Sequence, residues 1–133
     1  MKIFIDAGHG GSNPGAVGPN GLKEADVNLD VALRLGRLLS SRNYEVRYSR
    51  TSDINVGLRE RAMLANQWGA DYFISLHTNA SDVTSASGSE AFVYRRDSDA
   101  EYLAENILTQ LNYATGLQNR GVMVRPGLYV LKK

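Results

Sequence analysis

The chain has 133 residues, of which 43% are hydrophobic and 22% are charged, and its formal net charge at pH 7 is +1. These values are typical of one globular domain with a single core. The net charge is too small to indicate nucleic-acid binding, which relies on a surplus of basic residues to neutralise phosphates. The absence of cysteine excludes disulfides and thiolate zinc sites. No apolar run is long enough to span a membrane and no signal peptide opens the chain, so we expect neither membrane insertion nor a leader in this chain.

Strands and helices are predicted to alternate along the chain. Short apolar runs predict four strands, at 2–6, 45–49, 71–76 and 90–94. Segments of helical periodicity predict three helices, at 24–41, 56–68 and 98–114. Two further strand-like pieces follow, at 121–125 and 128–131. The sequence therefore predicts an α/β fold, an open and mostly parallel twisted sheet flanked by helices on both faces, as a single domain over residues 1–133. In the first helix, five apolar residues are predicted to face the core: Val27, Val31, Leu35, Leu38 and Leu39.

A glycine-rich loop follows the first predicted strand and holds one of the two histidines of the chain. The segment FIDAGHGG places His9 directly behind the strand, among three glycines. It lacks the GxGxxG spacing and the GKS/T ending of the common nucleotide loops, and the next helix begins about 13 residues later. A nucleotide-binding α/β domain is therefore a weak alternative.

The other histidine, His77, follows the third predicted strand. If the first three strands are ordered 2-1-3, His9 and His77 flank the switch point of the sheet, where ligands bind in such folds. Glu24 begins the first helix, where the glycine-rich loop returns the chain. Two histidines and a glutamate form a known ligand set for catalytic zinc, so we predict a Zn2+ site at His9, Glu24 and His77. The alternatives are a carboxylate that caps the helix and histidines with purely structural hydrogen bonds.

Six segments, in this order, resemble the zinc-dependent N-acetylmuramoyl-L-alanine amidases of the Amidase_3 type: DAGHGG, LKEADVNLDVA, YSRTSD, LRERAMLAN, GADYFISLHTNA and GSEAFVY. The resemblance runs from residue 2 to about 94, and more loosely to the end of the chain. It implies an open α/β sheet flanked by helices, and a zinc ion held by His9, Glu24 and His77. It also implies hydrolysis of the amide between N-acetylmuramic acid and the L-alanine of the stem peptide. The expected substrate is peptidoglycan and the expected place of action is the cell wall, as for an endolysin or autolysin.

Four other residues are predicted to support the site. Asn79 is expected to hydrogen-bond the substrate or to orient the loop of His77. Arg50 and Arg59 are expected to contact loops or stem-peptide carboxylates, and Asp6 to hydrogen-bond a ligand histidine. For each of them a purely structural hydrogen bond, salt bridge or Asx turn is the alternative.

The resemblance also implies a proton-transferring glutamate near the carboxyl end of the family's domain, on a strand after a segment like LYVLKK. No glutamate follows Glu105 in this chain, so no residue here is assigned that role. We therefore expect the chain to be incomplete at its carboxyl end, with the catalytic glutamate beyond Lys133 and a wall-binding domain after it. The alternative is a non-catalytic zinc-containing module that binds peptidoglycan or regulates its cleavage, and that has lost the glutamate.

Overall fold

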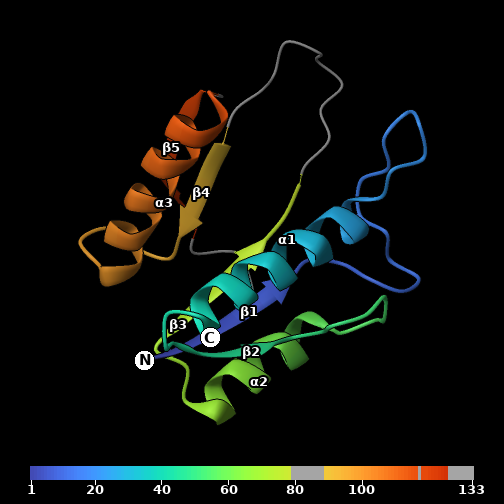
Figure 1. The fold of residues 1–133 in the computed structure, drawn as a ribbon, viewed down its shortest axis with the longest axis horizontal. Coiled ribbons are helices and arrows are strands. Elements are labelled where there is room, and N and C mark those ends of the chain that lie inside the picture. Colours follow the sequence, from blue (N-terminus) through green and yellow to red (C-terminus); the bar gives the residue numbers. More distant parts are fainter. Residues whose placement is uncertain (79–88, 117, 126–133) are drawn as a thin grey trace. The chain divides into compact units, whose positions relative to one another are not determined.

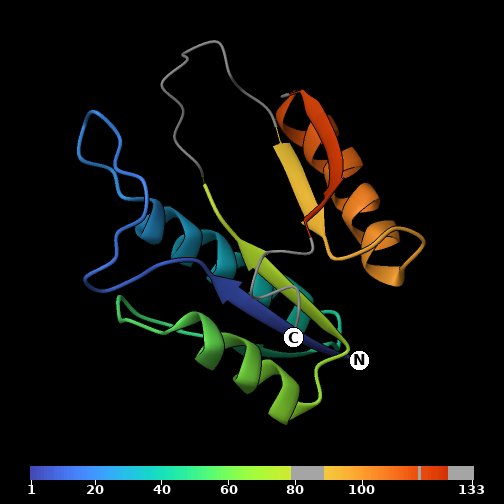
Figure 2. The same cartoon turned by 180° about the vertical axis from the view of Figure 1, so that it is seen from behind.

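The structure is a computed structural model that describes residues 1–78, 89–116 and 118–125 (Figures 1 and 2). The chain divides into two compact units, Met1–Ala80 and Ser81–Lys133. The predicted strand at 128–131 and the predicted site residue Asn79 lie outside the described residues. Within the described ranges, no helix has the length and apolar character needed to cross a membrane.

The first unit is built on a three-stranded parallel sheet with the order β2-β1-β3. Its elements, in chain order, are β1 (Lys2–Ala7), α1 (Glu24–Ser40), β2 (Glu45–Tyr48), α2 (Leu58–Trp68) and β3 (Tyr72–Leu76). In the central strand, Ile5 lies opposite Tyr48 on one side and Ile74 on the other. The predicted order 2-1-3 is confirmed, and it brings the carboxyl ends of β1 and β3 next to each other.

The two helices of this unit cover opposite faces of the sheet. Successive side chains of a strand point to opposite faces, and Ile3 and Ile5 pack with Ala32 of α1. Asp6, the residue after Ile5, points to the other face, where it binds Arg61 of α2. Accordingly, α1 lies in front of the sheet in Figure 1, and α2 lies in front in the opposite view of Figure 2. The prediction of a parallel sheet flanked by helices on both faces is confirmed.

Helix α1 packs on the sheet through a stripe of small or polar residues: Glu24, Ala25, Asn28, Ala32 and Gly36. Val31 and Leu38, which the apolar periodicity predicts to face the core, are 44% and 56% exposed, so this part of the prediction is wrong. The reason is a close approach at Gly36, where an added Cβ would overlap the hydroxyl of Tyr48. Because helix and sheet lie so near each other, small side chains occupy the interface and the larger ones lie beside it.

A buried ion pair joins the other face of the sheet to α2. The carboxylate of Asp6 is 2.7 Å from Arg61 Nη1, and both side chains are almost fully buried. The same carboxylate accepts hydrogen bonds of 2.7 Å from the hydroxyls of Ser49 and Ser75. Residues from β1, β3, α2 and the end of β2 therefore meet in one hydrogen-bonded group in which every charge has a partner.

The second unit contains β4 (Ser89–Val93), α3 (Asp99–Thr115) and β5 (Asn119–Val124). The two strands pair in parallel, with a register shift between Ser89 and Ala91, and α3 packs against both of them. The helix begins at Ser98, whose hydroxyl accepts the backbone N–H of Glu101, and it ends at Gly116 in the left-handed conformation. The α/β character predicted for this part of the chain is confirmed.

Replacing Asp6 with alanine is expected to lower the free energy of unfolding by about 3–5 kcal/mol, because Arg61 would remain as an uncompensated buried charge. Urea unfolding followed by circular dichroism measures this change. Asp30→Ala is the matched control, since Asp30 pairs with Arg34 at 3.0 Å on the exposed side of α1. Its expected effect is below about 0.5 kcal/mol. Equal losses in the two variants would contradict the role given to the buried pair.

Candidate metal centre

Three side chains from separate parts of the first unit meet at the carboxyl ends of β1 and β3. His9 follows β1, Glu24 is the first residue of α1 and His77 follows β3. One ligand atom of each lies within 4.8 Å of the other two. Glu24 Oε2 is 3.3 Å from His9 Nε2 and 3.1 Å from His77 Nδ1. The structure thus brings together the three residues that the sequence predicts as zinc ligands.

The two separations that involve Glu24 Oε2 fit a metal ion. Ligand atoms on a tetrahedral zinc lie roughly 3.3–3.4 Å apart, given bonds of about 2.0–2.1 Å. Both contacts of Glu24 Oε2 are close to that value. The two imidazole rings stand nearly perpendicular, with centroids 5.1 Å apart, so they are not stacked face to face. Two imidazoles and one carboxylate are also a donor set that zinc prefers.

The group is buried on one side and open on the other. The side chain of Glu24 is only 4% exposed, whereas those of His9 and His77 are 27% and 41% exposed. The carboxylate therefore forms the floor of the site, and the two rings border the solvent. An ion bound to all three would keep one side accessible to water or to a substrate.

Hydrogen bonds fix both oxygens of the Glu24 carboxylate. Oε1 accepts the backbone N–H of Ala16 at 3.0 Å. Oε2 accepts the backbone N–H of Thr78 at 3.1 Å and the side-chain amide of Asn28 at 3.3 Å. Burial by itself would raise the pKa of Glu24, but these hydrogen bonds and the neighbouring His9 outweigh it and lower that pKa below its usual value. Glu24 is therefore ionised at neutral pH, as a metal ligand must be.

These contacts also bear on the helix-capping alternative for Glu24. The donors to its carboxylate include Ala16 in the preceding loop and Thr78 after β3, and no free amide of the first turn of α1 is among them. The side chain points from the helix toward the two histidines rather than back onto its own backbone.

Two glycines let the backbone pass close to the ligand side chains. A Cβ at Gly8 would lie 2.6 Å from His77 Nδ1, and one at Gly15 would lie 2.7 Å from Glu24 Oε1. Gly15 also has φ +69°, a left-handed conformation that glycine adopts without steric cost. The glycine-rich loop thus serves to bring His9, Glu24 and His77 together.

Two buried arginines hold the backbone on which His9 stands. Arg61 donates to the carbonyl oxygens of Ala7 at 2.6 Å and of His9 at 2.8 Å. His9 has φ +63°, which is uncommon for a residue with a side chain. Arg61 also pairs with Asp6. The same guanidinium therefore takes part in the buried ion pair and holds the backbone conformation of His9.

Arg50, predicted as a supporting residue, supports the same turn and does not face outward. It is 3% exposed, and its guanidinium donates to four backbone carbonyls: those of Ala7, Gly8, Ala25 and Ser52. Burial and the nearby charge of Arg61 lower the pKa of Arg50, although an arginine remains protonated at neutral pH. The structure therefore shows the loop contacts expected of Arg50, which hold the backbone of the site.

Asp6, another predicted supporting residue, makes its contacts away from the three side chains. The carboxylate of Asp6 binds Arg61, Ser49 and Ser75, and no histidine is among its partners in the described part of the chain. The expectation that Asp6 orients a ligand histidine is corrected on this ground: it lies on the α2 face of the sheet. Arg59 is exposed on α2, and Asn79 lies outside the described residues.

Sequence reasoning missed the side chains that hold the ligands in place, namely Asn28, Arg61 and Thr78. For two of them a signal was present. Asn28 follows Glu24 by four residues, so both lie on the same side of α1. Arg61 precedes Ala65 by four residues, on the inward side of α2. Thr78 acts partly through its backbone N–H, which residue type does not reveal.

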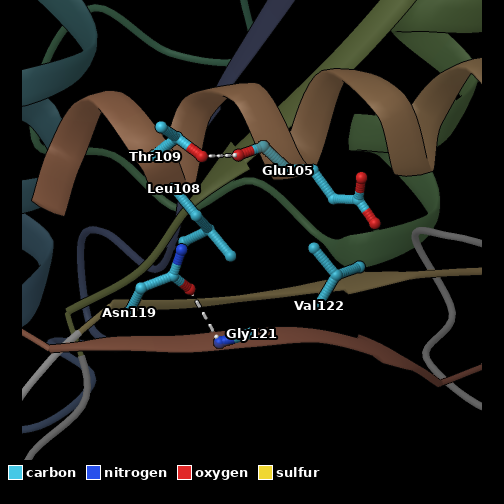
Figure 3. Close-up of a pocket in the computed structure, with 6 residues that line it drawn as sticks. All are labelled: Glu105, Leu108, Thr109, Asn119, Gly121 and Val122. Carbon is cyan, nitrogen blue, oxygen red and sulfur yellow. Dashed lines mark hydrogen bonds between the residues drawn. The ribbon is translucent and has the colours of Figure 1, made fainter.

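The second unit contains a hollow of about 300 Å³ between α3 and β5 (Figure 3). It is lined by Glu105, Leu108, Thr109, Asn119, Gly121 and Val122. The polar side chains are engaged locally, since Thr109 donates to the carbonyl of Glu105 and Asn119 accepts the N–H of Gly121. Glu105 is the one ionisable residue of this lining. The hollow therefore lacks the set of ionisable groups found around Glu24.

A protein-family model described as Amidase_3, N-acetylmuramoyl-L-alanine amidase, matches residues 3–133. The chain belongs to this family. The matched range includes the segments that carry His9, Glu24 and His77.

Individual relatives agree with this assignment. The chain is 48% identical over 97 residues to the sporulation-specific N-acetylmuramoyl-L-alanine amidase of Bacillus subtilis, a match that covers 71% of this chain and 36% of the relative. It is 39% identical over 132 residues to N-acetylmuramoyl-L-alanine amidase LytC of the same organism, covering 98% of this chain and 26% of LytC. The chain thus spans about a third or less of these curated relatives.

Among solved structures, the catalytic domain of the N-acetylmuramoyl-L-alanine amidase CwlV from Bacillus (Paenibacillus) polymyxa has the same fold. It superposes with a TM-score of 0.89 at 31% identity, over 99% of this chain and 73% of the CwlV domain. The α/β fold class is that of an amidase catalytic domain.

Gly8→Ala is expected to weaken zinc binding roughly 10–100-fold, the range typical of changes around metal ligands, because the added methyl group would displace the ring of His77. Competition with a chromophoric chelator measures the affinity. Gly57→Ala is the matched control, since a Cβ there has no neighbour within 4 Å. An unchanged zinc affinity in folded Gly8→Ala would contradict this account of the close approach.

Proposed function

We propose that the protein uses zinc to hydrolyse the amide bond between N-acetylmuramic acid and L-alanine in peptidoglycan. The observation that carries this proposal is the convergence of His9, Glu24 and His77 in a chain of the N-acetylmuramoyl-L-alanine amidase family. Relatives that align with this chain are N-acetylmuramoyl-L-alanine amidases by name, which specifies the same bond. On this proposal the protein acts at the cell wall, and peptidoglycan is its partner.

The three side chains would hold the zinc ion through His9 Nε2, the Glu24 carboxylate and His77 Nδ1, with a fourth position left for water or substrate. A zinc ion bound there would lower the pKa of its water toward ~7 and polarise the scissile carbonyl. The chain's own part is to keep the ligands in place. Glu24 is held ionised by the donors around its oxygens, and Arg61 fixes the backbone of His9.

The proton-transfer step needs a further acid–base group. Glu24 is the one carboxylate in the cluster with the two histidines, and both of its oxygens are engaged as described above. We therefore assign the step to none of the described residues. The resemblance gives it to a glutamate that follows a segment like LYVLKK in the family.

The decisive experiment incubates purified cell walls with the zinc-loaded protein that carries this chain. We expect new amino-terminal alanine and muramic-acid-free stem peptides, without new reducing sugar ends. In His77→Ala, release should fall to the level of the protein-free control, because one of three ligands is lost. Arg34→Ala, at an exposed position on α1, serves as the matched surface variant and should release at the wild-type rate.

Two results would overturn the proposal. One is unchanged release by His77→Ala. The other is bound zinc without any release by the wild-type protein, which would favour the non-catalytic zinc-containing module.

Removal of the metal is expected to abolish the same activity reversibly. Dialysis against a chelator should reduce release to background, and about one equivalent of zinc should restore it, whereas magnesium should not, since imidazole nitrogens suit zinc better. Release that persists in metal-free protein, verified by elemental analysis, would argue against a metal-dependent reaction.

A further inference from the structure

One buried side chain, that of Asn28, touches all three segments that carry the candidate ligands. It is 1% exposed. Its Nδ2 donates to the carbonyl of Gly8 at 3.1 Å and to Glu24 Oε2 at 3.3 Å. Its Oδ1 accepts the hydroxyl of Thr78 at 2.9 Å. Asn28 is thus bonded to the residue before His9, to Glu24 itself and to the residue after His77.

The contacts match the chemistry of a carboxamide and of no other side chain of this length. A carboxamide offers two N–H donors and an acceptor oxygen on one planar group. Here the donors face a carbonyl and a carboxylate, and the acceptor faces a hydroxyl. An aspartate has nearly the same shape but no donor when ionised, and it would place a negative charge beside Glu24.

We propose that Asn28 is a positioning residue that holds His9, Glu24 and His77 at the separation of a zinc site before the ion binds. This inference rests on the proposed zinc function. Groups that orient metal ligands without touching the metal typically contribute 10–100-fold to its affinity. Asn28 does so for three ligands at once, because each of its bonds ends on or next to one of them.

The residues that pack α1 against the sheet differ from those that Asn28 contacts. Ala25, Ala32 and Gly36 make the close contact between α1 and the sheet, and the ion pair of Asp6 and Arg61 joins the opposite face to α2. Within the described part of the chain, the hydrogen-bond partners of Asn28 all lie in the ligand-bearing segments. Loss of its donors should therefore disturb the site more than the fold.

The first arm of the test is Asn28→Asp, with Asn106→Asp as the matched control because Asn106 is exposed on α3 and donates only to the carbonyl of Tyr102. Zinc affinity is measured by chelator competition, and ligand geometry by the visible absorption of the Co2+-substituted protein. We expect Asn28→Asp to bind zinc about 10–100-fold more weakly, with an altered Co2+ spectrum. Asn106→Asp should match the wild type in both.

The second arm tests the same network without a buried charge. Thr78→Val removes the hydroxyl that donates to Asn28 but keeps the backbone N–H that donates to Glu24. It is expected to weaken zinc binding about fivefold, the effect of one neutral hydrogen bond. Thr78→Ser restores the hydroxyl and should recover the wild-type affinity. If Asn28→Asp does not fold, this pair decides the question.

Wild-type zinc affinity and an unchanged Co2+ spectrum in Thr78→Val, together with the same result in any folded Asn28→Asp, would overturn the role of Asn28 while leaving the proposed function intact. A wild-type protein that binds no zinc would overturn both proposals. Equal weakening in Thr78→Val and Thr78→Ser would also count against the network, since the hydroxyl would then make no difference.

Discussion

The candidate site depends on one buried guanidinium. Arg61 reaches from α2 beneath the end of β1, where it pairs with Asp6 and donates to the carbonyls of Ala7 and His9. The charge is tolerated in the interior because the carboxylate and the carbonyls together satisfy it. These hydrogen bonds fix the backbone of the turn after β1, and the ring of His9 is directed toward Glu24. Fold and site therefore share the same hydrogen bonds.

The candidate ligands combine one buried negative charge with two partly exposed imidazoles. An ionised carboxylate lies buried beneath two partly exposed imidazoles, and its charge is balanced by donors from a loop, a helix and the segment after β3. A cation entering this position meets a negative charge already desolvated and fixed in direction. Little reorganisation is then needed on binding, which is the general benefit of a preorganised site.

Much of this was accessible from the sequence. The alternation of strands and helices predicts the fold, and the switch-point rule places His9 and His77 in one crevice. Two of the predicted inward residues of α1, Val31 and Leu38, were misjudged, because hydrophobicity does not reveal how closely Gly36 approaches Tyr48. The role of Asp6 was misjudged for a related reason. A polar residue next to a motif looks functional in sequence, whereas only coordinates show that its partners are buried side-chain groups.

The close contact at Gly36 has a consequence for parts of the molecule far from it. Glu24 and Asn28 stand in the amino-terminal part of α1, roughly 18 Å and 12 Å along the helix axis from Gly36. A larger side chain at Gly36 would meet the ring of Tyr48, so either that ring or α1 would have to move, and a displaced α1 would carry Glu24 with it. The packing at this interior position is thus connected, through the helix, to the position of the carboxylate at the amino end of α1. A chemically inert residue distant from the site therefore takes part in holding it.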